Sequence, residues 1–380
     1  MMIGHISDTH LGAFIGRSEE LREVAEDVHG AFREAIDLFI RDHVDVVIHS
    51  GDVLDEPRPY GDALRVLLEG VRRLKERRIP FLFTLGEHDL SPIPSTPYPA
   101  LAQLLGLAEF VGDGVPHEVK GLTVVGLHKY KKFEARVLVE DLNSIGSRVR
   151  SLSGRKVLVL HQGLKEAFGP GSELSVSDLP NGFDYYAMGH IHRHFEMRLG
   201  RGLLAYPGAG HWVDVDDPDE CGVLIVDLSG DEPQAQWIRL ESVRPKVLVR
   251  VEAHELEREL RRLMERESAK KPVLWMEVEG EGVDLSEVEK RLSQKYVIRR
   301  LVLRQRRKAG AQLGGEEELN VDAELRRLAL EAVGDEEVVE YALGELLRLL
   351  SEDGTEEAER SLWEFWRKRK RYGVELGERR

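Results

Sequence analysis

The sequence predicts an α/β protein in which a two-sheet sandwich is followed by a small β-α-β-α-β domain and a helical C-terminal tail. Strand-like runs alternate with amphipathic helices in the first part of the chain, and several strands follow one another closely before residue 245. Beyond that point short strands and helices alternate compactly, and the end of the chain has only helical spacing. Helices that alternate with strands predict layered sheets.

The first part of the chain alternates strands and helices in order. β-Branched and aromatic residues predict strands at Met2–Ser7, Val44–His49 and Pro80–Thr84. Apolar residues recur at helical spacing in the two segments between these strands, Glu19–Arg41 and Asp62–Arg77. This alternation predicts a layered α/β sheet.

Five later strands are expected before residue 245, at Lys156–Leu160, Tyr185–Met188, Leu203–Tyr206, Gly222–Leu228 and Ala235–Leu240. The last three lie close together without long helices between them, so we expect a β-rich half that completes a two-sheet sandwich. Residues 1–244 are therefore predicted to form the first domain.

A compact second domain is predicted at residues 245–304. It contains strands and helices in strict alternation, at Lys246–Glu252, His254–Glu267, Pro272–Val278, Leu285–Gln294 and Tyr296–Leu303. Residues 305–320 are polar and rich in glycine, which is typical of a linker. Residues 321–380 predict three helices, at Ala323–Val333, Glu336–Leu350 and Glu356–Tyr372. Short helices bury little apolar surface alone, so we expect this tail to dock onto something.

The composition limits the classes of protein that fit. The net charge of −15 argues against a generally basic nucleic-acid binder, although local basic clusters leave DNA binding open. The single cysteine, Cys221, rules out an internal disulfide and a cysteine-based zinc site. No apolar run approaches the roughly 18 residues of a membrane helix. The first residues show no signal-peptide pattern, and we therefore expect a cytoplasmic protein.

Five short clusters of Asp, Glu and His each follow a strand-like run. They are Asp8-Thr9-His10, Gly51-Asp52, Gly86-Glu87-His88-Asp89, His161-Gln162 and Gly189-His190-Ile191-His192. Because ligands gather at the carboxyl edge of such sheets, we expect these side chains to converge. Asp, Glu and His in this mixture suit Mn²⁺ best, and Mg²⁺ or Fe²⁺ less well. The number of candidate ligands fits two ions better than one, and two ions can activate a water for attack on phosphorus.

The ordered set resembles the calcineurin-like metallophosphoesterase superfamily, whose pattern is Asp-x-His, Gly-Asp, Gly-Asn-His-Asp/Glu, His and Gly-His-x-His. Within this superfamily the chain is similar to the archaeal, SbcD-like nucleases of DNA double-strand-break repair. The segments that carry the resemblance are His5–Gly12, Ile48–Asp52 with Arg58-Pro59, Leu160–Gly163 and Tyr185–His192. The resemblance implies a Mn²⁺-dependent DNA endo/exonuclease that processes DNA ends.

The resemblance also implies a role for each site residue. One ion would be held by Asp8, His10, Asp52 and His192. The other would be held by Asp52, Glu87, His161 and His190, so that Asp52 bridges the two ions. His88 would face the scissile phosphate and either stabilise charge or protonate the leaving oxygen, and Asp89 would orient the His88 imidazole.

Two positions depart from the family pattern. Glu87 stands where the pattern has Asn, and a third carboxylate reduces the positive charge that two ions present to a phosphodiester. Its expected effects are a higher pKa of the bridging water, tighter metal binding, a changed preference between ions, or loss of the second ion. Asp55 stands where some relatives carry a histidine implicated in exonuclease action.

Binding partners are a further implication of the resemblance. The small domain would be a capping domain that contacts DNA phosphates, with contributions from Arg58, Arg299, Arg300 and Arg304. The tail would bind the coiled coil of an SMC-like ABC-type ATPase through Trp363, Phe365 and Trp366. The alternative for these rings is packing against the protein itself. A homodimer is expected through the helix Asp62–Arg77.

Three functions are compatible with the sequence. The first is a two-metal DNA nuclease that acts with an ATPase. The second is a metallophosphoesterase for small phosphodiesters, against which the capping domain and the tail argue. The third is a DNA-end-tethering scaffold whose metal site is weakened by Glu87.

Overall fold

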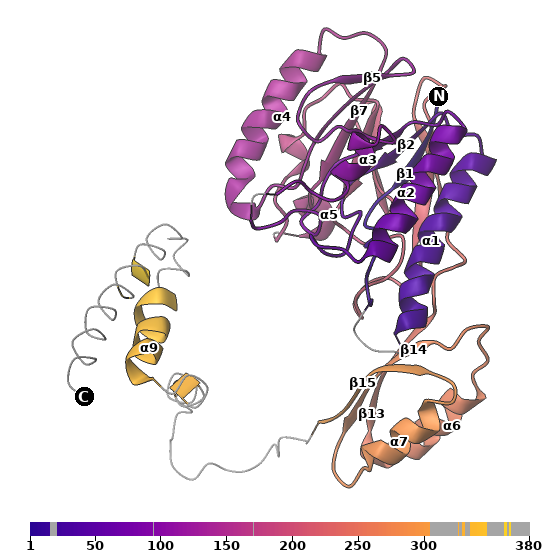
Figure 1. Ribbon diagram of the computed structural model, residues 1–380, viewed down its shortest axis with the longest axis vertical. Coiled ribbons are helices and arrows are strands. Elements are labelled where there is room, and N and C mark those ends of the chain that lie inside the picture. Colours follow the sequence, from indigo (N-terminus) through magenta and orange to yellow (C-terminus); the bar gives the residue numbers. More distant parts are fainter. Residues whose placement is uncertain are drawn as a thin grey trace. The chain divides into compact units, whose positions relative to one another are not determined.

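The structure, a computed structural model, describes four long stretches and parts of the tail: residues 1–15, 21–93, 95–169, 171–304, 326, 329–330, 335–347, 361–362 and 365. The chain divides into two compact units, Met1–Arg306 and Arg307–Arg380. The first unit contains two large sheets with helices on their outer faces, followed by a smaller α/β part (Figure 1). The predicted fold class is therefore confirmed.

The first large sheet has six strands in the order β12-β11-β1-β2-β3-β4. Their bounds are β1 Met2–Ile6, β2 Val46–His49, β3 Phe81–Phe83, β4 Glu109–Phe110, β11 Gly222–Asp227 and β12 Gln234–Arg239. Strands β1 to β4 are parallel, whereas β11 and β12 are antiparallel to their neighbours. Two of the three strands expected in the β-rich half thus complete the first sheet.

The second large sheet also has six strands, in the order β5-β6-β7-β8-β10-β9. Their bounds are β5 His117–Val119, β6 Leu122–Leu127, β7 Arg155–His161, β8 Tyr185–Gly189, β9 Phe195–Leu199 and β10 Gly202–Tyr206. Strands β6, β7, β8 and β10 run parallel. The third expected strand of the β-rich half is β10, so that half is divided between the two sheets.

Helices cover the outer face of each sheet. Helices α1 (Arg22–Arg41) and α2 (Gly61–Glu76) bury their apolar stripes on the first sheet, and α4 (Ala135–Val149) does so on the second. Figure 1 shows α1 and α2 together on one side of the sandwich and α4 on the other. Shorter helical segments occur at α3 Ala100–Leu104, η1 Lys132–Glu134, α5 Lys165–Phe168 and η2 Val176–Asp178.

A separate apolar core joins the inner faces of the two large sheets. Ile3, Val46 and Ile48 of the first sheet pack with Val157 and Tyr185 of the second, and all five are fully buried. This core fixes the two sheets face to face, so the loops at the carboxyl ends of their parallel strands lie at one edge of the sandwich.

The small domain has the predicted β-α-β-α-β order. Its elements are β13 Lys246–Glu252, η3 Ala253–Glu255, α6 Leu256–Glu265, β14 Val273–Glu279, α7 Leu285–Leu292 and β15 Val297–Arg304. The three strands are parallel in the order β13-β14-β15, and α6 and α7 pack on one face of the sheet. The side chain of Asp284 caps α7 by accepting from the backbone N–H groups of Ser286 and Glu287.

The small domain is attached to the sandwich through both apolar and charged contacts. The rings of Trp212 and Trp275 meet edge to face with centroids 5.5 Å apart. Arg244, only 4% exposed, donates from Nε to Asp27, from Nη2 to Glu23 at 3.3 Å and from Nη1 to the backbone oxygen of residue 271 at 2.9 Å. Because a buried guanidinium is stable only when its hydrogen-bonding partners are present, these contacts hold the junction in one arrangement.

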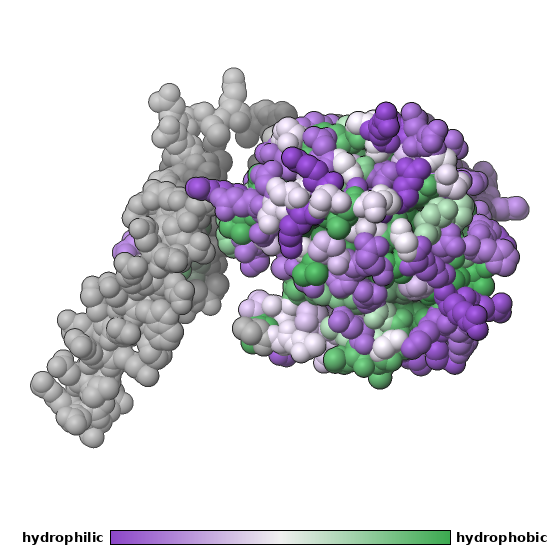
Figure 2. All heavy atoms as spheres, turned by 90° about the horizontal axis from the view of Figure 1, so that it is seen from above, coloured by the Kyte–Doolittle hydropathy of each residue, from purple (hydrophilic) through white to green (hydrophobic). Residues whose placement is uncertain are grey.

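The surface of the first unit is mixed in polarity. Figure 2 shows hydrophilic and hydrophobic residues interspersed on the face seen from above. Large exposed apolar side chains, such as those of Leu104 and Phe133, are scattered along the sequence. Single apolar residues at a surface are normal for folded proteins.

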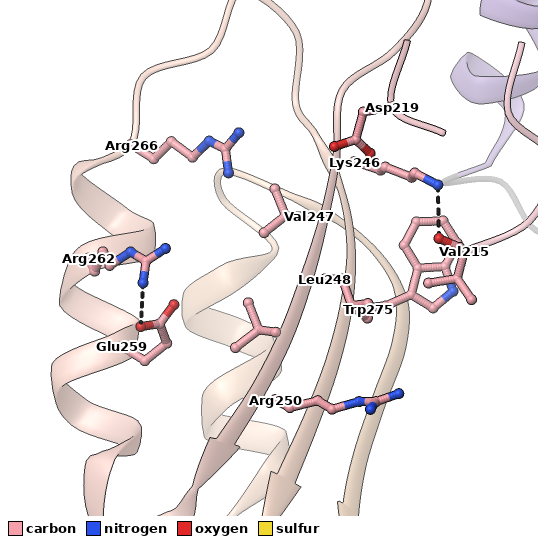
Figure 3. Close-up of a pocket in the computed structure, with 11 residues that line it drawn as sticks. Val215, Asp219, Lys246, Val247, Leu248, Arg250, Glu259, Arg262, Arg266 and Trp275 are labelled. Carbon is pink, nitrogen blue, oxygen red and sulfur yellow. Dashed lines mark hydrogen bonds and ion pairs between the residues drawn. The ribbon is translucent and has the colours of Figure 1, made fainter. Parts of the chain in front are cut away.

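A groove of about 500 Å³ lies along the outer edge of β13 (Figure 3). Its lining includes Lys246, Leu248, Arg250, Arg262 and Arg266 of the small domain. The ammonium of Lys246 is occupied with backbone carbonyls of the sandwich, one of them that of Val215 at 2.8 Å. None of the predicted metal ligands lines this groove, so it is distinct from the metal clusters.

In the tail, α9 (Glu336–Tyr341) continues as one π-helical turn, η4 (Ala342–Leu346). These elements agree with the first part of the predicted helix Glu336–Leu350. The other two predicted tail helices lie almost wholly outside the described residues. Among the described helices, none is both long enough and apolar enough to cross a bilayer.

Candidate metal centre

The five predicted clusters lie at or just after the carboxyl ends of β1, β2, β3, β7 and β8. The first three strands are parallel neighbours in one sheet, and the last two are parallel neighbours in the other. Since the two sheets pack face to face, their loops meet at a single edge. The topology thus explains why residues separated by up to 184 positions, from Asp8 to His192, gather in one place.

The loops that carry the ligands have unusual backbone conformations. Asp8, His10, Asp52 and His190 have positive φ angles of 50°, 41°, 53° and 89°. Residues with a Cβ rarely adopt this region, and such strain persists where the surroundings impose it, often at functional sites. The backbone N–H groups of Asp8 and His10 donate to the carbonyl oxygens of Gly51 and Asp52, at 3.0 and 3.1 Å. These bonds lock the loops after β1 and β2 together.

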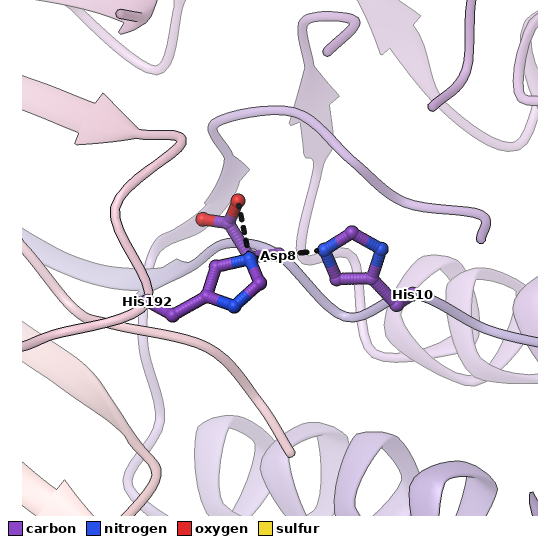
Figure 4. Close-up of side chains that lie close together, drawn as sticks. All are labelled: Asp8, His10 and His192. Carbon is purple, nitrogen blue, oxygen red and sulfur yellow. Dashed lines mark hydrogen bonds and ion pairs between the residues drawn. The ribbon is translucent and has the colours of Figure 1, made fainter. Parts of the chain in front are cut away.

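A first group of ligand atoms comes from Asp8, His10 and His192, whose side chains point toward one another (Figure 4). The Nε2 atoms of the two imidazoles are 3.2 Å apart, and the His192 Nε2 is 3.8 Å from the Asp8 Oδ1. Ring nitrogens this close to each other and to a carboxylate are directed at one shared position. A cation at that position would satisfy all three groups.

A second group comes from Glu87, His161 and His190. The Oε2 of Glu87 is 3.1 Å from the Nε2 of His161, and its Oε1 is 2.9 Å from the Nδ1 of His190. The longer side chain at position 87 therefore reaches both imidazoles.

Asp52 lies between the two groups. Its Oδ2 is 3.1 Å from the Nε2 of His161 and 4.0 Å from the Nε2 of His10. Its oxygens also group with those of Asp8 on one side and Glu87 on the other. This is the position that a bridging carboxylate requires.

The donor set fits divalent cations. The structure brings all seven predicted ligands together: Asp8, His10, Asp52, Glu87, His161, His190 and His192. Three carboxylates and four imidazoles are ligands that hard to borderline ions accept, and their division into two groups around one shared carboxylate fits a pair of ions.

The pKa values of the ligand side chains are shifted by the closely spaced carboxylates and imidazoles of the site. Burial opposes a charged imidazole, yet the carboxylate of Asp52 raises the pKa of His161 well above its ordinary value. In the same way burial is outweighed at His10, where Asp55 and Asp52 raise the pKa to about 9. Despite burial, the pKa of Glu87 is lowered by His161 and His190. Divalent cations would replace the protons on these imidazoles, so binding should release protons.

Two carboxylates that the motifs do not include lie beside the outer ring nitrogens of ligand histidines. Asp217 Oδ1 is 2.8 Å from Nδ1 of His192, and its Oδ2 accepts from the backbone N–H groups of Val213 and Asp214. Despite burial, the hydrogen bond from His192 lowers the pKa of Asp217 to about 2. On the other side, Asp55 Oδ1 is 3.4 Å from Nδ1 of His10. A carboxylate on the outer nitrogen fixes the tautomer and the ring angle of a metal-binding histidine.

Replacing Asp217 by Asn is expected to weaken metal binding about 10- to 100-fold, because His192 would lose its orienting carboxylate. Isothermal titration of the chelated protein with Mn²⁺ measures the change. The matched control is Asp216→Asn, an exposed neighbour that should bind Mn²⁺ as the unmodified protein does. Equal affinities for the two variants would contradict the orienting role.

His88 lies beside both ligand groups. Its backbone N–H donates to Asp52 Oδ1 at 2.9 Å, and its ring packs edge to face against that of His10. The ring Nδ1 is 2.9 Å from the backbone carbonyl of Asp55, so this nitrogen carries the proton of that bond. The side chain is exposed, which leaves it accessible to a substrate.

The expected role of Asp89 requires a correction. Its carboxylate accepts from the backbone N–H groups of Val53, Leu54 and Gly86, at 3.0 to 3.2 Å, instead of holding the His88 ring. Burial and the charge of Asp52 raise the pKa of Asp89 to about 7. Asp89 thus ties the loop after β3 to the loop after β2, and the carbonyl of Asp55 holds the imidazole.

The glycines of the motifs are required by close packing. A Cβ on Gly86 would overlap the carboxylate of Asp52 and the ring of His161. A Cβ on Gly51 would overlap the same ring, and Gly51 also has a φ of 100°. Glycine at these positions lets the backbone approach the ligands.

The predicted DNA contacts are exposed but lie in different parts of the first unit. Arg58 is in the loop between β2 and α2, whereas Arg299, Arg300 and Arg304 are on β15. Arg300 and Arg304 share the nearly buried carboxylate of Glu277, at 3.6 and 2.9 Å. Arg299 is the extra residue of a β-bulge between β14 and β15.

Of the three predicted partner contacts in the tail, only Phe365 is described. Its ring stacks on that of Tyr341, with centroids 4.0 Å apart and an interplanar angle of 6°. Both residues belong to the tail, and the partner contact of Phe365 stays a prediction. Trp363 and Trp366 lie outside the described residues.

Comparisons with known proteins agree with this geometry. The family model for calcineurin-like phosphoesterases matches residues 1–194. The chain is 31% identical over 304 residues to the DNA double-strand break repair protein Mre11 of Sulfurisphaera tokodaii, and the match covers 76% of each chain. It is also 31% identical to the protein of that name from Saccharolobus solfataricus, over 74% of this chain and 76% of the relative. The protein of that name from Thermoplasma acidophilum is 31% identical as well, over 73% of this chain and 76% of the relative. The chain therefore belongs to the calcineurin-like phosphoesterase family and, within it, to the group of the archaeal Mre11 proteins.

Proposed function

We propose that this protein is a metal-dependent DNA nuclease that hydrolyses phosphodiester bonds at or near DNA ends in double-strand-break repair. The observation that supports the proposal most directly is the convergence of seven Asp, Glu and His side chains into two ligand groups that share Asp52. The similarity to Mre11 proteins over 76% of the chain points to DNA as the substrate.

The proposed cofactors are two Mn²⁺ ions, with Mg²⁺ or Fe²⁺ as alternatives. Asp8, His10 and His192 would hold one ion, Glu87, His161 and His190 would hold the other, and Asp52 would contact both. When bound, two such ions neutralise phosphate oxygens and lower the pKa of water.

The protein's own groups would position the substrate and move a proton. The His88 imidazole, held through Nδ1 by the carbonyl of Asp55, is placed to stabilise charge on the phosphate or to protonate the leaving oxygen. Asp89 keeps the loop that carries His88 against the loop that carries Asp52. A fixed imidazole beside the ligand groups reduces the entropic cost of reaching the reactive geometry.

Removal of metal tests the proposal. Protein treated with a chelator and then dialysed is expected to lose all cleavage of linear double-stranded DNA, and added Mn²⁺ should restore it. Undiminished cleavage by protein shown to be metal-free by elemental analysis would refute the proposal. Turnover of cyclic nucleotides without DNA binding would favour a small-substrate phosphoesterase. Two bound ions without any hydrolysis would favour a tethering scaffold.

The arginines of β15 and Arg58 are the proposed DNA phosphate contacts. The double substitution Arg299→Gln and Arg300→Gln removes two positive charges and should weaken DNA binding regardless of base sequence. It should also reduce the salt dependence, because each lost contact lowers the slope of log K against log salt by about one. Fluorescence anisotropy at several salt concentrations measures this slope. Arg291→Gln, a change at a partly exposed position on α7, is the control, and an equal slope for the control and the double variant would argue against these contacts.

The remaining partners are also proposals. We propose a homodimer formed through α2 and an SMC-like ABC-type ATPase bound by the tail, with Trp363, Phe365 and Trp366 as contacts, in the cytoplasm. The proposed domains are a nuclease domain at 1–244, a capping domain at 245–304, a linker at 305–320 and an ATPase-binding region at 321–380.

A further inference from the structure

A lysine lies beside the second ligand group. The Nζ of Lys129 is 3.9 Å from the Oε2 of Glu87 and 2.7 Å from the Oε1 of Glu173, and its side chain is only 8% exposed. Its backbone N–H donates to the carbonyl of Leu85 at 2.8 Å, which ties its loop to the one that carries Glu87. Among the residues that the structure describes, Lys129 is the only lysine or arginine that forms an ion pair with one of the seven ligands.

Glu173 holds this lysine in place. Its Oε2 accepts from the backbone N–H of Gly163 at 2.9 Å, two residues beyond the ligand His161. Its Oε1 is 2.7 Å from the lysine and 3.9 Å from the Nε2 of His190. The ammonium is thus confined between two carboxylates at the edge of the second group.

The carboxylates of the ligand groups carry negative charge that the ammonium of this lysine can offset. With Glu87, the seven ligands include three carboxylates, and each one reduces the positive charge that two divalent ions would present to a phosphodiester. The ammonium lies 3.9 Å from Glu87 and 2.7 Å from Glu173, so its one positive charge offsets part of the negative charge that these two carboxylates place beside the second group.

We propose that Glu87 and Lys129, with the lysine also held by Glu173, form a partly charge-compensated pair, in which Lys129 offsets part of the negative charge that Glu87 brings to the site of the second divalent cation. The inference deepens the proposed nuclease function and rests on it. Lys129 acts through Glu87 and is therefore a positioning residue, with no direct role in the chemical step. The pair would let a charged carboxylate hold the ion without repelling the anionic substrate.

A cycle of variants tests the pair by Mn²⁺ binding in the absence of DNA. The full chain is freed of metal and titrated with Mn²⁺ by calorimetry, as the unmodified protein, Glu87→Gln, Lys129→Met and the double variant. Glu87→Gln should weaken the second Mn²⁺ about tenfold, and Lys129→Met should tighten it by a similar factor, as expected for one unit charge near the ion. The double variant should bind close to the unmodified affinity, because the two changes cancel.

Matched variants separate charge from structure. Lys129→Arg keeps the charge and should retain the unmodified affinity, whereas Lys132→Met, an exposed lysine three residues away, should change nothing. If Lys129→Met melts at a lower temperature in chelator, Lys129→Gln replaces it, because the amide can still donate to Glu173. If the variants that neutralise Lys129, Lys129→Met or Lys129→Gln, bind the second Mn²⁺ more weakly than the unmodified protein or equally well, the proposal is overturned.

DNA cleavage provides the second readout. In Lys129→Met the KM for DNA should rise about tenfold with a smaller change in kcat, and the double variant should return toward the unmodified KM. A fall in kcat with an unchanged KM would overturn the compensating role. If the unmodified protein cleaves no DNA, the nuclease proposal fails, while the calorimetric cycle still decides whether the pair is charge-compensated.

Discussion

Replacement of Asp52 by Ala is expected to abolish DNA cleavage and to reduce the bound metal. Its carboxylate is shared by the two ligand groups and lies 3.1 Å from the Nε2 of His161. It also accepts from the backbone N–H of His88 at 2.9 Å, so the substitution removes a ligand and an anchor together. Loss of a contribution of several kcal/mol corresponds to at least about a thousandfold decrease in kcat/KM.

Two measurements on purified protein check this expectation: the rate of cleavage of linear DNA with Mn²⁺, and the metal content per chain. The control is Asp231→Ala. Asp231 is exposed in the loop between β11 and β12, and this variant should behave as the unmodified protein. Robust cleavage by Asp52→Ala at any Mn²⁺ concentration would exclude the two-ion site as the source of activity.

Replacement of His88 by Leu is expected to reduce cleavage about 10²- to 10⁴-fold, the range typical of a lost general acid or base. Both Mn²⁺ ions should still bind, because the seven ligands remain. The hydrogen bond between Nδ1 of His88 and the carbonyl of Asp55 fixes the ring and leaves its other nitrogen to face a substrate.

Calorimetry and single-turnover cleavage measured on the same preparation separate the two possible roles of His88. Retained binding of two ions with slow cleavage agrees with a role toward the substrate. Loss of an ion in His88→Leu would instead make His88 a ligand, since its ring nitrogen lies near the oxygens of Asp52 and Glu87. His88→Gln, which retains a hydrogen-bond donor, should show an intermediate cleavage rate.

Much of the fold follows from local patterns. The predicted strand Lys246–Glu252 has the observed bounds of β13, and the predicted helix Asp62–Arg77 differs from α2 by one residue at each end. These segments are recognisable because their apolar residues repeat at one clear period. Several elements have no counterpart among the predicted segments, and the longest of them are β6 (Leu122–Leu127) and α4 (Ala135–Val149). β6 is buried on both faces and therefore lacks the alternation that marks a half-exposed strand.

Membership in the sheets depends on contacts between distant parts of the chain. β11 pairs with β1 across more than 200 residues of sequence and brings the β-rich half into the first sheet, while β10 joins the second. Nothing within either strand specifies its neighbour, because both are short apolar runs. Which sheet each strand joins is decided by how the two large sheets bury their inner faces together.

The sequence by itself marks the five motifs at the ends of strands, and the family resemblance selects the seven candidate ligands within them. Tertiary structure alone decides the partners that orient and compensate them. Asp217 meets His192 across 25 residues, and Lys129 meets Glu173 across 44. The role of Asp89 was wrongly predicted for the same reason: its backbone partners at positions 53 and 54 lie on another loop. Hydrogen bonds and ion pairs act over a few ångströms of space, so sequence separation does not reveal them.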